Sequence, residues 1–155
     1  MDIKLRKATT KDIPLLIQLR IDFIVDEAGA ITQEQETAIR SQMQTYFTKH
    51  IPEDTCIVIL AEADGKAVST AYLSIFEKPA HISSLTGVAA TVYNVLTYPS
   101  HRRKGIATKV VTRLIEEAKK TNISRIHLSA TESGLPVYEK LGFKKSSYTE
   151  MSLKI

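Results

Sequence analysis

The sequence has 155 residues, the length of one compact domain, with 43% hydrophobic and 25% charged residues. This composition is typical of a globular chain and excludes a collagen-like or low-complexity one. The net charge of +4 is modest for a nucleic-acid-binding protein, so we expect no nucleic-acid partner. The longest apolar run, residues 56–61, is far too short to cross a bilayer, so we expect no membrane partner.

The first residues alternate charged and aliphatic side chains without the apolar stretch of a secretory signal, so we expect a cytoplasmic protein. Cys56 is the only cysteine, and its place in an apolar run predicts a buried side chain. The histidines lack the spacing of metal ligands, so no metal site is expected. The oligomeric state stays open between a monomer and a homodimer.

The N-terminal third predicts a strand followed by two helices. Residues 3–7 alternate apolar and charged side chains, which is the period of a strand. Thr10 is a candidate N-cap for a helix with a broad apolar face, and Gly29 breaks that pattern. A more polar helix is predicted over residues 32–49, before Pro52.

The middle third predicts a β-hairpin, a loop and another strand. Residues 55–62 are rich in β-branched side chains and lead through a tight turn into a second run over residues 67–76. Residues 77–90 contain Pro79 and small residues, and they predict a loop of a length that is often functional. A strand over residues 91–97 follows.

The C-terminal third begins with an amphipathic helix, because aliphatic side chains recur every four residues from Ile106 to Ala118. Its charged side chains, which include Glu117, are expected to face solvent. The other elements predicted here are a strand over residues 125–130, a short helix over residues 136–141 and a last strand over residues 148–154.

The strongest local signal is the junction between the strand over residues 91–97 and this helix. Gly105 at the start of the helix lets the backbone approach an anion closely, and the first amide hydrogens of a helix have no internal partner. Arg102, Arg103 and Lys104 add positive charge, so the junction predicts a phosphate-binding turn. The alternative is a basic turn that starts a surface helix. The glycines of a Walker loop or of a dinucleotide-binding motif are missing.

Residues 102–107, Arg-Arg-Lys-Gly-Ile-Ala, resemble the pyrophosphate-binding signature of the GNAT superfamily of N-acetyltransferases: Arg or Gln, two residues, Gly, one residue, then Gly or Ala. Residues 137–143 resemble the tyrosine-containing helix of that superfamily and the strand after it. Many members carry an asparagine seven residues before this tyrosine, where the chain has Thr131. The resemblance covers the whole chain. It implies a single acetyltransferase domain over residues 1–155, of class α/β (α+β), with a GNAT-like mixed, mostly antiparallel sheet and helices on both faces.

The resemblance also implies acetyl-CoA as the cosubstrate. Main-chain groups of the strand before the turn would pair with its pantetheine arm, and amide hydrogens of the turn would hold its pyrophosphate. The residues implied to bind it are Val95, Leu96, Thr97, Arg102, Arg103, Lys104, Gly105, Ile106, Ala107 and Thr108.

Two further groups of residues receive roles from the resemblance. Tyr138 stands where many members have the residue that protonates the departing thiolate; the alternative is an aromatic ring that packs one helix face. Asn94 can orient an acceptor or a water molecule but cannot accept a proton. Phe23, Asp26 and Glu27 are candidates to line the acceptor site, although charges at a helix end are more often simply solvated.

The implied activity is direct transfer of an acetyl group to the primary amine of a small molecule, with the thioester carbonyl polarised by a main-chain amide of the strand that contains Val95. The sequence identifies no general base. The alternatives are acetylation of a protein N-terminus or lysine side chain and a noncatalytic acyl-CoA sensor, since a fold does not guarantee turnover.

Overall fold

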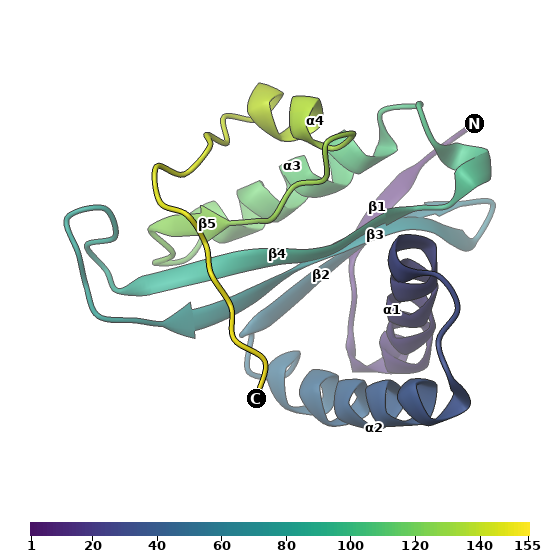
Figure 1. Cartoon of the computed structure of the whole chain (residues 1–155). Coiled ribbons are helices and arrows are strands. Elements are labelled where there is room, and N and C mark those ends of the chain that lie inside the picture. Colours follow the sequence, from purple (N-terminus) through teal and green to yellow (C-terminus); the bar gives the residue numbers. More distant parts are fainter.

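The computed structural model describes residues 1–155 as one five-stranded sheet between two layers of helices (Figure 1). The strands are β1 (Lys4–Lys7), β2 (Cys56–Ala63), β3 (Lys66–Glu77), β4 (Val88–Thr97) and β5 (Arg125–His127). The helices are α1 (Ile13–Ala28), α2 (Gln33–His50), α3 (Ile106–Lys119) and α4 (Leu135–Lys140), with short 3-10 helices at Thr10–Asp12 and Pro99–His101. None of the helices has both the length and the apolar character needed to cross a membrane.

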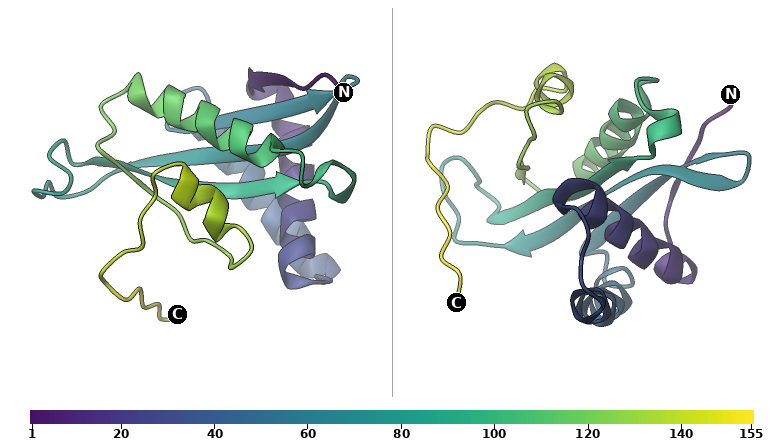
Figure 2. Two further views of the ribbon diagram at one scale, coloured as in Figure 1. Left: turned by 90° about the horizontal axis from the view of Figure 1, so that it is seen from above. Right: turned by 45° about the vertical axis from the view of Figure 1, so that its right-hand side comes forward.

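The strands follow one another across the sheet in chain order. Neighbours from β1 to β4 are antiparallel, and β5 is parallel to β4 because α3 carries the chain back across the sheet. The expected mixed, mostly antiparallel sheet with helices on both faces is therefore confirmed. Seen from above, α3 runs along the sheet and α4 lies beside it (Figure 2).

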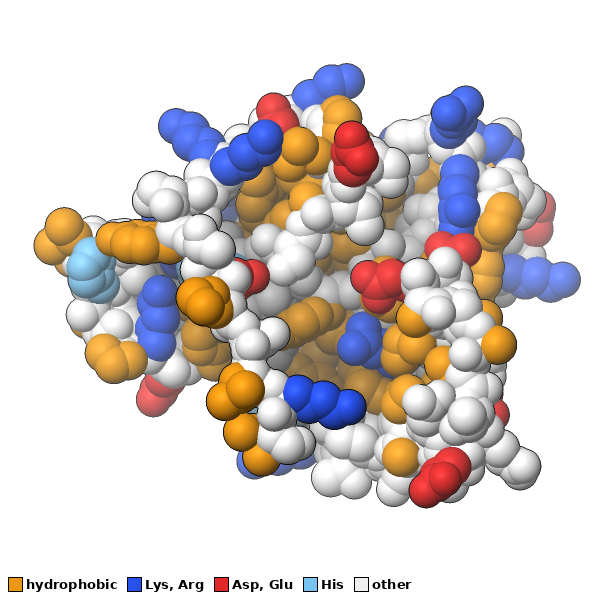
Figure 3. Space-filling model, viewed as in Figure 1, with side chains coloured by type: hydrophobic (Ala, Val, Ile, Leu, Met, Phe, Trp, Pro, Cys, Tyr) orange, Lys and Arg blue, Asp and Glu red, His pale blue; other side chains and the backbone are white.

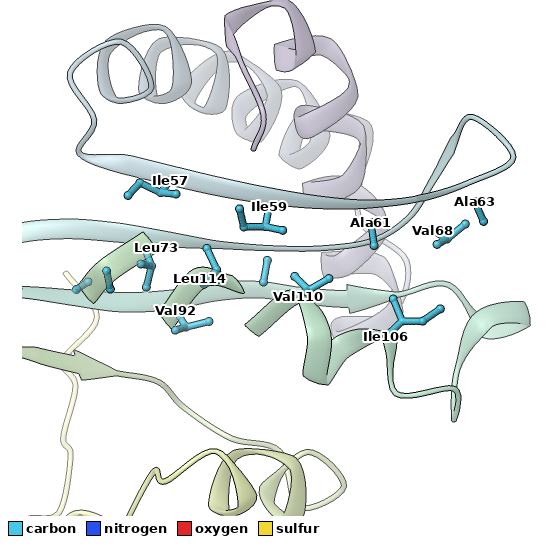
Figure 4. Close-up of a cluster of buried hydrophobic side chains, with 13 residues drawn as sticks. Ile57, Ile59, Ala61, Ala63, Val68, Leu73, Val92, Ile106, Val110 and Leu114 are labelled. Atoms are coloured by element: carbon cyan, nitrogen blue, oxygen red, sulfur yellow. The ribbon is translucent and has the colours of Figure 1, made fainter. Parts of the chain in front are cut away.

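Each face of the sheet has its own hydrophobic core. Between the sheet and α3, Val110 and Leu114 face Ile59 and Val92 (Figure 4), and all four side chains are buried. On the other face, α1 and α2 pack on the sheet around Phe47, which is fully buried. The four-residue periodicity of α3 thus predicted its buried face correctly, and Cys56 is buried in the second core as expected.

Two local predictions near the ends of helices are wrong. Thr9, not Thr10, caps the first helical turn, because its side chain and that of Asp12 bond each other's main-chain amides in a capping box. Glu117 is buried, not solvated, because Arg113 and Lys120 each donate to its carboxylate at 3.1 Å. These two bonds outweigh the effect of burial and lower the pKa of Glu117.

The C-terminal strand is the largest error in the predicted secondary structure. Residues 148–154 alternate apolar and polar side chains, yet they form no strand, and the segment is exposed. β5 also ends at His127 and does not reach residue 130 as expected. A strand is stable only when it pairs, and a three-residue β5 offers few free main-chain groups to a further strand.

Candidate active site

The site begins at a β-bulge in β4. Thr70 pairs with Leu96 while Tyr72 pairs with Tyr93, so β4 has one more residue than β3 over this stretch. Asn94 lies in the bulge with φ of 58°, a left-handed conformation that asparagine adopts more readily than most residues. The extra residue reverses the alternation of side chains along β4, so that Val92 lies in the core under α3 and Leu96 in the core under α1 and α2.

Asn94 connects the bulge to α1. Its side chain is buried, with the amide nitrogen donating to the carbonyl oxygen of Leu19 at 3.4 Å and the amide oxygen accepting from Arg20 Nη1 at 3.3 Å. The partners of this side chain are therefore groups of the protein. In this arrangement Asn94 positions Arg20 on α1, and through Arg20 it can still influence what binds at the bulge.

Half of β4 has a free edge on the side of β5. β5 pairs only with Ala89, Ala90 and Thr91, so the rest of β4 has no neighbouring strand there. A cleft of about 670 Å³ follows this free edge, and Val95, Leu96 and Thr97 line it. Leu96 meets the cleft through its main chain, because its side chain belongs to the core under α1 and α2. The carbonyl oxygens of Leu96 and Thr97 accept from the side chains of Ser69 and Arg102, and no strand pairs with the main chain near Val95 on this edge. An extended ligand can therefore bond the main chain there.

The cleft leads to the N-terminus of α3. Gly105 is the N-cap with φ of 73°, and no side chain caps the helix. The amide hydrogens of Ile106, Ala107 and Thr108 find no acceptor in the protein, and all three residues line the cleft. Unpaired amides and the positive end of the helix dipole favour an anion here. The structure thus brings these residues together as the sequence predicted.

The three basic residues of the turn have different partners. Arg102 donates to the carbonyl oxygen of Thr97 at 2.8 Å and forms an ion pair with Asp26 at 2.9 Å, so it ties the turn to the end of α1. Lys104 donates to the carbonyl oxygen of Ser100 at 3.2 Å and does not line the cleft. Arg103 is exposed, lines the cleft and has no ion-pair partner. Arg103 is therefore the cation of the turn that is free to meet an anion.

A second cavity, of about 640 Å³, adjoins the cleft. Five residues line both, namely Phe23, Glu27, Val95, Thr131 and Tyr138. Figure 3 shows a hollow with apolar side chains in its floor and charged ones around it, on the face that the C-terminal segment crosses. Phe23 and Glu27 thus lie at the junction of the two cavities, whereas Asp26 is bound to Arg102.

Tyr138 lies at this junction as well. Its ring is held edge-on against Phe143, with centroids 6.0 Å apart, and no protein group bonds its hydroxyl. Burial raises the pKa of the Tyr138 phenol, so the hydroxyl keeps its proton at neutral pH. A protonated phenol at the meeting point of two cavities can donate a proton to a group that becomes anionic there.

Sequence reasoning missed most of the second cavity. Its walls include Arg20 from α1, Lys78 from the segment after β3, His127 from β5 and Glu150 from the C-terminal segment. His127 is exposed, and its pKa is lowered by partial burial and by the nearby charges of Lys78 and Arg125. The sequence could have indicated part of this cavity through helical periodicity, because Arg20, Phe23 and Glu27 share a face of α1.

A comparison with protein families identifies the class of protein that this fold and cleft define. The model of the acetyltransferase (GNAT) family matches residues 22–143, which is most of the chain. The chain therefore belongs to the GNAT N-acetyltransferase family, and the resemblance noted in its sequence is confirmed.

Solved structures agree over nearly the full length. The chain is similar to a predicted acetyltransferase from Clostridium acetobutylicum, solved with acetyl-CoA, at 32% identity and a TM-score of 0.86, over 97% of this chain and 96% of that one. A GCN5-related N-acetyltransferase from Ralstonia eutropha JMP134 has 24% identity and a TM-score of 0.84, over 99% of each chain. Glucosamine-6-phosphate N-acetyltransferase from Arabidopsis thaliana has 21% identity and a TM-score of 0.69, over 99% of each chain. The last two likenesses concern the fold alone.

Proposed function

We propose that the protein transfers an acetyl group from acetyl-CoA directly to the primary amine of a small molecule. The observation that carries this proposal is the cleft along the free edge of β4, which ends at the unpaired amides of α3. A strand edge can bond the amide groups of a pantetheine arm, and a helix N-terminus can hold a pyrophosphate. The residues present fit acetyl-CoA, and the similar protein from Clostridium acetobutylicum was solved with it.

The residues of the turn divide the work of binding. Gly105 has open space where a Cβ atom would lie, so the backbone can approach a phosphate closely. The amides of Ile106, Ala107 and Thr108 supply hydrogen bonds, and Arg103 supplies charge. Arg102 keeps the turn against α1 through Thr97 and Asp26, which makes it a positioning residue.

The chemistry takes place where the cavities meet. Acetyl-CoA supplies the acetyl group as a thioester, whose C–S bond breaks as the C–N bond of the new amide forms. A main-chain amide near Val95, next to the bulge, polarises the thioester carbonyl. Tyr138 gives its phenolic proton to the departing thiolate and recovers one from solvent. Glu27, which lines both cavities, attracts the cationic amine, and the amine's protons leave to water.

The second cavity favours a small acceptor. Its volume of about 640 Å³ is within the range of small-molecule sites, and it opens directly onto Tyr138. An acceptor bound there would hold its amine next to the thioester. Little more translational or rotational freedom would then be lost in the reaction, which accelerates a bimolecular step.

A thiol-release screen tests the proposal. The protein is incubated with acetyl-CoA and a library of primary amines, and free coenzyme A is measured, with Tyr138→Phe as the matched variant that keeps the ring. We expect thiol release that depends on both an amine and the Tyr138 hydroxyl. Tight binding of acetyl-CoA without thioester consumption by any amine would instead favour an acyl-CoA sensor.

A further inference from the structure

The second cavity holds an arginine that forms no ion pair with a carboxylate. Arg20 is half-buried and lines this cavity, yet no acidic group forms an ion pair with it. Four of the other arginines pair with carboxylates, and the remaining two, Arg103 and Arg125, are exposed. A guanidinium that is partly removed from water without a counter-ion is costly, so its place needs an explanation.

Arg20 is also held in position. Its Nη1 donates to Asn94 at 3.3 Å, and its Cζ lies 5.7 Å from the centre of the Phe23 ring, a cation–π arrangement. Asn94 is in turn anchored to the carbonyl oxygen of Leu19. One weak bond to a neutral amide leaves most of the guanidinium donors of Arg20 free. The side chain is therefore arranged in advance with donors to spare.

Besides Arg20, the residues with titratable side chains that line the cavity include Lys78, His127, Glu27 and Glu150. Lys78 is half-buried, lines the cavity and has no ion-pair partner. His127 stands near Lys78, Arg125 and Glu150, and partial burial together with the two positive charges lowers its pKa. Glu27 lies at the junction next to Tyr138, and Glu150 reaches the cavity from the C-terminal segment. Neither carboxylate pairs with Arg20.

We propose that the acceptor carries an acidic group, a carboxylate or a phosphate, in addition to its amine, and that Arg20 binds this group while the amine faces Glu27 and Tyr138. This inference rests on the proposed function, since it names the acceptor of the same site. The planar guanidinium matches the geometry of both anions and can bond either one through two parallel hydrogen bonds. Lys78 adds a second positive charge to the same cavity.

Matched pairs of amines test the inference. Each pair has one member with an acidic group and one without: glycine and glycinamide, 4-aminobutyrate and 4-aminobutyramide, O-phosphoethanolamine and ethanolamine. Acetylation is measured as kcat/KM for thiol release, with the wild-type protein and with Arg20→Gln. Arg125→Gln is the control, because it removes the same charge from an exposed arginine that lines neither cavity.

We expect the acidic member of at least one pair to be preferred about tenfold or more, the effect of a charge-assisted hydrogen bond. Arg20→Gln should abolish this preference through the KM of the acceptor, and Arg125→Gln should keep it. The inference is overturned if the neutral members are preferred, if no member is preferred, or if both variants have the same effect. The comparison between pairs also separates a carboxylate from a phosphate.

Calorimetric binding of the same compounds, with coenzyme A present, separates this inference from the proposed function. If the acidic members bind through Arg20 and no thioester is consumed, the proposed function fails, and Arg20 remains the binding group for an acidic ligand that is not an acceptor. If neutral amines are acetylated and Arg20→Gln has no effect, the inference fails and the proposed function stands. If none of the compounds binds or reacts, the inference is overturned. The wild-type comparison needs no variant, so it remains valid even if Arg20→Gln does not fold.

Discussion

The two adjoining cavities are built in different ways. More than half of the residues that line the cleft along β4 come from residues 95–108, which are the end of β4, the turn and the start of α3, and the others come from α1 and residues 131–138. The second cavity is lined by side chains from α1, β4, β5, the segment after β3 and the C-terminal segment. A main-chain site binds what all substrates of a family share, whereas a side-chain site can change with single substitutions. In the proposed function, the first cavity therefore binds the cosubstrate that the family shares, and the second cavity binds the acceptor.

Tyr138→Phe should have the largest effect, because Tyr138 belongs to both cavities and its hydroxyl is the proposed proton donor. We expect kcat to fall about 10²- to 10⁴-fold, while the affinity for coenzyme A changes little. Steady-state kinetics and calorimetry measure the two quantities. A kcat within about twofold of the wild-type value would reduce Tyr138 to a packing residue.

Gly105→Val should impair the main-chain cleft alone. A β-branched side chain at φ of 73° is strained, and its Cβ would occupy the space left for a phosphate. We expect the Kd for coenzyme A to rise about tenfold or more, because the hydrogen bonds to the pyrophosphate are charge-assisted.

Gly65 provides the control for Gly105. It has φ of 75° and equally open space, but it lies in the turn between β2 and β3 and lines neither cavity. Gly65→Val should therefore lower the Tm by a similar amount without changing the Kd for coenzyme A. An unchanged Kd in folded Gly105→Val protein would contradict binding at this turn.

Two neighbouring carboxylates on α1 test whether the two cavities bind different substrates. Glu27 lies at the junction, whereas Asp26 is occupied by Arg102. Glu27→Gln should raise the KM of the acceptor several-fold, about 3- to 10-fold, and leave the KM of acetyl-CoA unchanged. Asp26→Asn frees Arg102 and should act weakly, on the KM of acetyl-CoA. The reverse assignment of the two effects would place the acceptor elsewhere.

The smallest expected effect concerns the pH dependence of kcat, which ionisation of Tyr138 should leave unchanged. Because burial raises the pKa of Tyr138 above its ordinary value near 10, the phenol keeps its proton as the pH rises. We expect no loss of kcat from deprotonation of Tyr138 between about pH 7 and about pH 9, in saturating amine. A fall in kcat with an apparent pKa below about 9, absent from Tyr138→Phe, would show that the phenol ionises earlier.

Much of the fold could be predicted because its signals are local. The apolar stripe of α3, the hairpin of β2 and β3, and the glycine before α3 each depend on residues close together in the chain. The same reliance on local pattern produced the errors. Residues 148–154 have the alternation of a strand but lack a partner edge, and the carboxylate of Glu117 is buried because two cations reach it.

The sequence by itself determined the glycine at the start of α3, the family, and the face of α3 that is buried, because main-chain conformation and helix amphipathicity follow from neighbouring residues. Only the tertiary structure decided which charges remain without partners. It placed Arg20 beside Asn94, 74 positions further along the chain, and it joined Arg102 to Asp26 across the cleft. Contacts of this kind depend on how distant segments pack, so they cannot be predicted from the spacing of residues along the chain.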